Sequence, residues 1–182
     1  MCSGGSIATT RSWRESVLAD LPFFSLDVEG VPVPKGRPRV TRAGHVYTPQ
    51  KTREYEGRIR NATMILMAGR EPTALPCVVH VGVFFEPPRS LSKKKRAELF
   101  AGGGFHAIKP DLDNVVKAAL DGICGENMAI FDDKQIVEIC CYKTYAQSAR
   151  LAVDVYEVTS DVDRFASRWR AHEQVDVAIS PI

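Results

Sequence analysis

Alternating apolar positions predict four main strands in this chain. The clearest runs from residue 77 to residue 85, where every second side chain is apolar and the pattern ends at two prolines. The set comprises residues 23–28, 77–85, 135–145 and 150–158, with a further short strand at Val46-Tyr47. The last two of the main strands follow one another closely, so we expect them to form a hairpin.

Apolar residues spaced at the helical period predict two main helices. One covers residues 111–124, where Leu112, Val115 and Ala119 belong to a single stripe that Gly125 ends. The other runs from Pro49 to about Ala68, with Thr48 as its N-cap. Two shorter helices are expected, a basic one at residues 92–100 and a last one at residues 163–171.

This order of elements predicts a single α+β domain with a mixed sheet and two main helices. The expected domain covers residues 23–159. Residues 1–22 are expected to be an N-terminal extension, flexible or carrying a short helix, and residues 160–182 a C-terminal extension.

Composition narrows the class of protein. The 182 residues are 45% hydrophobic and 25% charged, as in an ordinary globular domain, which excludes collagenous, coiled-coil and wholly disordered chains. No run of roughly 18 apolar residues predicts a membrane span. The start lacks an apolar signal core, and the five cysteines are odd in number without metal-ligand spacing. We therefore expect a cytoplasmic protein with reduced, mostly buried thiols.

Charge is strongly segregated although the net charge is only +2. Basic residues dominate residues 35–60 and 89–109, whereas acidic residues dominate residues 110–140. Basic arms around an acidic cluster suit the processing of a polyanion, because the bases hold phosphates and a cation offsets the acids. The alternative is ordinary solvated surface charge. The candidate phosphate contacts are Lys35, Arg37, Arg39, Lys51, Lys93, Lys94, Lys95, Arg96 and Lys109.

The acidic cluster has the residue types of a metal site. Pro110 sets the helix start, so Asp111 and Asp113 lie in its first turn, with Lys117 one turn further on. A second pair, Asp132-Asp133, precedes a strand at a turn that could bring one of them beside the helix start. Carboxylates gathered in this way favour Mg²⁺, which activates water for phosphodiester hydrolysis.

Each of these acids also has a purely structural interpretation. Asp111 could simply cap the helix, and Asp113 with Lys117 could form an i,i+4 ion pair worth about 0.3–0.5 kcal/mol. The pair Asp132-Asp133 could be an exposed turn. Spacing alone does not choose between these interpretations and a metal site, nor does it identify the substrate.

The segments Lys109-Pro-Asp-Leu-Asp-Asn114 and Phe131-Asp-Asp-Lys-Gln-Ile136 resemble the signature of the RusA family of Holliday junction resolvases. Two upstream segments, Pro34–Arg39 and Tyr47–Thr52, are also similar to that family, and the likeness extends from Phe24 to Val158. It implies a RusA-like fold and a homodimeric, Mg²⁺-dependent endonuclease, with Mn²⁺ as a possible substitute. Such enzymes cut four-way DNA junctions symmetrically, in recombination and repair.

The resemblance also assigns roles to individual residues. Asp111, Asp113 and Asp133 become the catalytic metal ligands, with Asp132 as the alternative to Asp133, and Lys117 becomes the catalytic lysine. The basic arms listed above would then contact the junction by shape and phosphate.

Phe105 and His106 come just before the acidic motif. Phe105 or His106 could wedge into DNA, although a simple loop role is the other interpretation of His106.

A non-catalytic protein that binds branched DNA is the main alternative function, and an enzyme acting on nucleotides is the other. The intact acids disfavour the former, and the long basic arms disfavour the latter.

Overall fold

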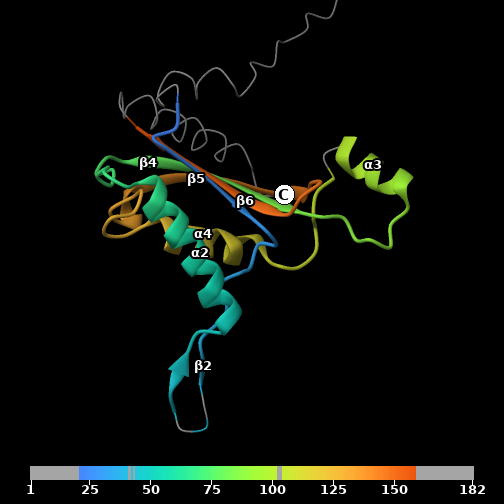
Figure 1. The fold of residues 1–182 in the computed structure, drawn as a ribbon, viewed down its shortest axis with the longest axis horizontal. Coiled ribbons are helices and arrows are strands. Elements are labelled where there is room, and N and C mark those ends of the chain that lie inside the picture. The colour runs from blue at the N-terminus through green and yellow to red at the C-terminus, as the bar shows by residue number, and fades with distance from the viewer. Residues whose placement is uncertain (1–20, 41, 43, 102–103, 159–182) are drawn as a thin grey trace, which may run out of the picture.

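The structure is a computed structural model that describes residues 21–40, 42, 44–101 and 104–158 (Figure 1). Its main sheet is mixed, with strand order β1-β6-β4-β5. Strand β6 pairs antiparallel with β1 and β4, and β5 pairs parallel with β4. The strands are β1 (Phe24–Glu29), β4 (Cys77–Phe85), β5 (Ile136–Tyr145) and β6 (Arg150–Glu157). The expected α+β domain with a mixed sheet is confirmed.

The predicted hairpin of the last two strands is wrong, because β4 lies between β5 and β6. Seven of the nine residues of β4 are buried, which suits a strand with neighbours on both edges. Alternation in β5 and β6 shows which faces they present, but it does not show which strand each one pairs with.

Two helices cover one face of the sheet, α2 (Gln50–Leu66) and α4 (Leu112–Ile123). The apolar stripe predicted for α4 packs into the core. Helix α2 begins one residue later than predicted, since Pro49 has a ψ of 140° and serves as the N-cap in place of Thr48. The basic helix α3 (Lys93–Ala101) is confirmed and stands to one side of the sheet (Figure 1).

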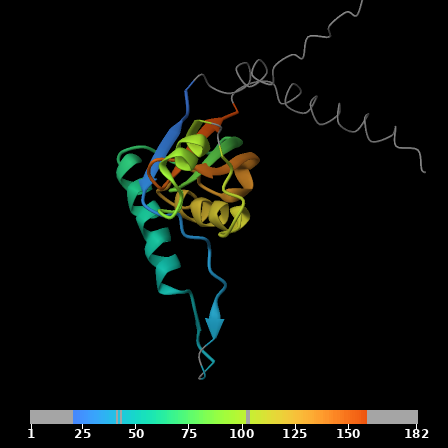
Figure 2. The ribbon, with the colours of Figure 1, turned by 90° about the vertical axis from the view of Figure 1, so that its right-hand side faces the viewer.

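A two-stranded hairpin projects from the body beyond the start of α2 (Figures 1 and 2). It is formed by β2 (Arg39–Val40) and β3 (Val46–Tyr47), which pair antiparallel. We call residues 37–48 the arm. Prolines 32, 34 and 38 keep the chain extended on the way into it.

Some expectations concern residues beyond those described. The helix predicted at residues 163–171, most of the N-terminal extension and the C-terminal extension lie outside the described residues. Among the helices that are described, none has the length and apolarity needed to cross a membrane.

Candidate active site

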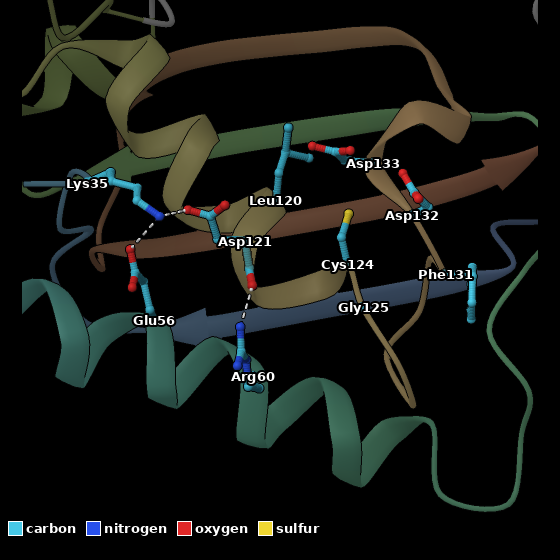
Figure 3. Close-up of a pocket in the computed structure, with 10 residues that line it drawn as sticks. All are labelled: Lys35, Glu56, Arg60, Leu120, Asp121, Cys124, Gly125, Phe131, Asp132 and Asp133. Atoms are coloured by element: carbon cyan, nitrogen blue, oxygen red, sulfur yellow. Dashed lines mark hydrogen bonds and ion pairs between the residues drawn. The ribbon is translucent and has the colours of Figure 1, made fainter.

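An open pocket of about 460 Å³ lies between α2, α4 and the turn that precedes β5 (Figure 3). We call it the acidic pocket, because four of its side chains are carboxylates. Its lining residues are Lys35, Glu56, Arg60, Leu120, Asp121, Cys124, Gly125, Phe131, Asp132 and Asp133. The pocket therefore joins residues from four separate stretches of the chain.

Lys35 neutralises one side of this pocket. Its ammonium group donates a hydrogen bond to Asp121 and forms an ion pair with Glu56 Oε1 at 3.5 Å (Figure 3). The hydrogen bond to Asp121 is the main reason why the pKa of Lys35 is raised. Its main-chain N–H also donates to the carbonyl of Asn114, at 2.8 Å. Lys35 thus holds the segment leading into the arm against both the first and the last turn of α4.

The α2 side of the pocket is fixed through Arg60. Its Nη2 donates to the carbonyl oxygen of Asp121 at 3.0 Å, near the end of α4. Glu56 lies one turn earlier on the same helix. The contact between the two helices therefore sets the distance between the two walls of the pocket.

The short turn before β5 uses its two aspartates differently. Asp132 accepts a hydrogen bond from the N–H of Lys134 at 3.0 Å and forms an ion pair with the Lys134 ammonium at 2.9 Å. These interactions lower the pKa of Asp132, the hydrogen bond from the Lys134 side chain most of all. Gln135 closes a capping box with Asp132 and holds the turn to the carbonyls of Thr73 and Leu75. Asp132 therefore stabilises the turn, and Asp133 lies beside it at the pocket.

A second pocket of about 450 Å³ lies at the start of α4 and shares Lys35 with the first. Asp111 and Lys109 are on its wall. Asp111 occupies the N-cap position, but its side chain makes no capping hydrogen bond. Capping alone does not account for this carboxylate, which stays exposed to solvent.

Asp113 and Lys117 are exposed on α4, and neither lines the two pockets. Asn114 Nδ2 donates to Asp113 Oδ1 at 3.4 Å. The i,i+4 ion pair between Asp113 and Lys117 is not among the salt bridges found in the described part of the chain. The structure thus leaves both side chains at the surface of the helix start.

The predicted metal ligands are only partly brought together. Asp111 and Asp133 border two pockets that share Lys35, while Asp113 faces solvent. Within the ranges that the structure describes, no three His, Cys, Asp or Glu side chains are arranged to hold a metal ion. The acids are therefore gathered in one region, but not around one point.

Cys124 is the thiol of the acidic pocket, and its environment disfavours the thiolate. Burial raises its pKa to about 12, and the negative charge of Asp133 contributes. A nucleophilic role for this thiol does not fit, because the reactive form of cysteine is the thiolate. The expectation of mostly buried thiols is wrong for the described cysteines, because Cys77 alone among them is buried, Cys124 and Cys140 are partly exposed, and Cys141 is exposed.

The two residues proposed as DNA wedges differ in exposure. His106 is 6% exposed and stacks on Phe85 at a centroid distance of 4.1 Å, so neither the wedge nor the simple loop role describes it. Sequence gives no sign of this packing, because residues 102–108 contain no periodic pattern. Phe105 is 79% exposed, so its side chain is available for the predicted wedge role.

The predicted phosphate contacts lie on two separate projections and at the pockets. Arg37 and Lys51 are exposed at the arm and its base, and Arg39 belongs to β2. Residues 93–96 form the first turn of α3, where Lys95 pairs with Glu98 at 3.4 Å. Lys109 borders the second pocket, whereas Lys35 is engaged by acids of the protein itself.

Comparison with known proteins identifies the family of the chain. The family model described as "Endodeoxyribonuclease RusA" matches residues 29–156, which include all of the predicted catalytic residues. The chain is also 30% identical over 140 residues to the "Uncharacterized protein YqaN" of Bacillus subtilis (strain 168). That match covers 73% of this chain and 95% of the Bacillus protein. The chain belongs to the RusA family of endodeoxyribonucleases.

Proposed function

We propose that this protein is a Mg²⁺-dependent, structure-specific endonuclease that resolves four-way DNA junctions by paired cuts during recombination and repair. The observation that carries the proposal is the family match over residues 29–156 with Asp111, Asp113, Lys117 and Asp133 all present. Their carboxylates and ammonium group are the groups that phosphodiester hydrolysis requires.

The chemical types of the candidate ligands fit Mg²⁺. Asp111, Asp113 and Asp133 offer hard oxygen ligands, and the available thiol in the acidic pocket is protonated. Bound there, Mg²⁺ would lower the pKa of a water molecule and offset charge on the phosphate. The single chain does not place three ligands around one point, so we assign donors without a coordination geometry.

The residues of the chain support phosphate binding on two sides. The arm and α3 project from different parts of the body and carry exposed lysines and arginines (Figure 1). Lys117 lies one helical turn from Asp113, where it is suited to stabilise charge on the phosphate or its leaving oxygen. A branched DNA presents phosphates in several directions, which suits contacts that are widely separated.

One observation favours a second function. Because no three-ligand cluster forms among the described residues, a protein that binds branched DNA without cutting it is also consistent with the structure. Asp113→Asn separates the two functions. Removing this charge should abolish cleavage, while binding of the junction is unchanged or tighter because phosphate repulsion falls.

The experiment is a cleavage assay on synthetic four-way, forked and linear duplex DNA, with Mg²⁺, Mn²⁺, Ca²⁺ or chelator. We expect paired cuts in the four-way junction with Mg²⁺, and binding without cutting in Ca²⁺. Asp27→Asn is the matched control, because Asp27 pairs with Arg150 on the sheet, away from both pockets. Cleavage by Asp113→Asn at the wild-type rate would contradict the metal assignment, and no cleavage under any condition would favour the binding protein.

A further inference from the structure

Lys143 lies on the face of β5 that points toward the helices. Its register partner in β4 is Val83, which has no exposed surface, and Tyr145 on the same face of β5 packs against the core. A lysine is unusual in such a position, because an ammonium group that leaves water loses its hydration and needs hydrogen-bond partners in return. The contacts of this ammonium group show why the position carries a lysine.

The ammonium group of Lys143 binds two main-chain carbonyls, and it forms no salt bridge within the described part of the chain. It donates to the carbonyl oxygen of Ile108 at 2.7 Å and to that of Pro110 at 2.5 Å. Neither carbonyl accepts a hydrogen bond from a main-chain N–H of the described residues. Lys143 thus supplies the donors that these carbonyls need, and the second carbonyl belongs to the residue directly before Asp111.

Other hydrogen bonds also hold this segment to the end of β5. The N–H of His106 donates to the carbonyl of Lys143 at 3.1 Å, and the hydroxyl of Thr144 donates to the carbonyl of Gly104 at 2.9 Å. Both bonds lie further from Asp111 along the chain than the contacts of the ammonium group do. Thr144 therefore anchors the same segment without reaching the helix start, which makes it a matched comparison for Lys143.

The connection from Lys143 to the acids of the helix start is short. The carbonyl of Pro110 belongs to the planar peptide that enters Asp111, so holding this carbonyl holds that peptide. The Asp111 side chain makes no capping hydrogen bond of its own. The Asp111 carbonyl accepts a hydrogen bond from the N–H of Val115 at 3.3 Å. A shift of Asp111 is therefore passed on to the first turn of α4, which contains Asp113.

We infer that Lys143 is a positioning residue for the acids of the helix start: its ammonium group holds the main chain that enters α4 and so sets the places of Asp111 and Asp113. The inference rests on the proposed function in that it assigns these two carboxylates to a metal ion. Groups that orient metal ligands from behind contribute about 10–100-fold to metal affinity or activity.

Positioning and simple electrostatics predict opposite effects of removing this charge. An ammonium group near a cation site repels the cation, so its removal alone should tighten metal binding. Loss of positioning should weaken metal binding, because the carboxylates are no longer held in place for the ion. The sign of the change in metal affinity therefore separates the two roles.

The first test is a titration of the full chain with Mn²⁺ in the absence of DNA, followed by electron paramagnetic resonance. Lys143→Met removes the donors and keeps a long unbranched side chain, and it should weaken Mn²⁺ binding by about 10-fold or more. Lys143→Arg keeps a charged donor and should retain most of the affinity. Thr144→Val should bind Mn²⁺ as wild type does. Circular dichroism checks that each variant is folded at the temperature of the titration.

The second test needs neither metal nor DNA. The N–H of Val115 reports the helix start, since it donates to the carbonyl of Asp111 and its residue has no exposed surface. Its hydrogen exchange, measured by NMR, should be faster in Lys143→Met because the first turn of α4 opens more often. The exchange rate should be unchanged in Thr144→Val.

The cleavage assay separates this inference from the proposed function. Lys143→Met should require more Mg²⁺ for cleavage, with the KM for the junction unchanged. Wild-type or tighter Mn²⁺ binding by Lys143→Met, an equal loss in Thr144→Val, or unchanged exchange of Val115 would overturn the inference. A wild type that binds Mn²⁺ but cuts no junction, together with weaker Mn²⁺ binding and faster exchange in Lys143→Met, would support the inference and contradict the proposed nuclease instead.

Discussion

The contact between α2 and α4 depends on a glycine, and replacing it should loosen the acidic pocket. Gly122 is buried against Ile59, which has no exposed surface. A Cβ atom at position 122 would lie 2.3 Å from Ile59 Cγ2 and 2.7 Å from Ile59 Cβ. Such distances are far below van der Waals contact, so Gly122→Ala must displace Ile59 or move the helices apart.

The expected loss of stability follows from two opposing effects. Overpacking a well-packed core costs about 1–3 kcal/mol. Alanine in place of glycine within a helix returns about 1 kcal/mol. Because Ile59 is fully enclosed, we expect the clash at the upper end and a net loss of roughly 1–2 kcal/mol in the free energy of unfolding. For a chain of this size that corresponds to about 2–8 °C in Tm.

Urea and thermal unfolding measure this effect, with Gly57→Ala as the matched control. Gly57 lies within α2, and an added Cβ there would meet nothing within 4 Å, so this variant should be as stable as wild type or slightly more. Ile59→Ala removes the clashing atom, and in combination with Gly122→Ala it should show a favourable coupling of about 0.5–3 kcal/mol. If Gly122→Ala were as stable as Gly57→Ala, the description of this helix contact would be refuted.

Three further predictions concern the acids, the buried histidine and the arm. Asp133→Asn should abolish cleavage and leave Tm unchanged, whereas Asp132→Asn should lower Tm and retain cleavage; the reverse pattern would exchange their roles. Burial lowers the pKa of His106, so the unfolded chain binds more protons, and stability present above about pH 6.5 is lost as pH falls. His106→Phe should therefore reduce the drop in Tm between about pH 7.5 and pH 5.5, and an unchanged drop would count against this cause. Junction affinity should fall steeply with salt, and the Arg37→Ala and Lys51→Ala variants should each reduce the slope of log affinity against log salt by about 1.

Local patterns predicted most of the elements, because helices and strands are specified by periodicities within a few residues. The stripe in α4 and the alternation in β4 are examples, and both elements form within a residue or two of their predicted limits. The pairing of β5 was beyond such reasoning. Its partner is set by how the whole sheet is ordered, and alternation is the same whichever strand lies beside it.

Prediction of the site shows the same division between local and distant information. The aspartates of the helix start could be found because they directly follow Pro110, and Lys117 because it lies four residues beyond Asp113. The ion pair of Lys35 with Asp121 joins residues 86 apart, and no local spacing connects them. Glu56 and Arg60 were missed for a similar reason, since one turn of an amphipathic helix does not show what packs against it.

Compensation of charge distinguishes the acids of this region from one another. Lys35 offsets Asp121 and Glu56, so these two carboxylates do not require a bound cation to coexist. Lys134 and the capped turn do the same for Asp132. Three of the acids in this region are therefore already compensated by lysines. Their mutual repulsion is only weak support for a bound metal at these positions.

The acids of this region that lack such compensation are Asp111, Asp113 and Asp133. They are the same three that the family resemblance selects. Asp111 makes no capping hydrogen bond, and neither Asp113 nor Asp133 forms a salt bridge among the described residues. The helix dipole stabilises the first two, by about 0.3–1 kcal/mol at an exposed position. A bound cation, or a metal bound to phosphate, would stabilise most the carboxylates whose charge is least compensated by the protein. Lys35→Met should therefore leave the metal dependence of cleavage in place, whereas Asp111→Asn should raise the Mg²⁺ concentration that cleavage requires; a loss of metal dependence in Lys35→Met would reverse this assignment.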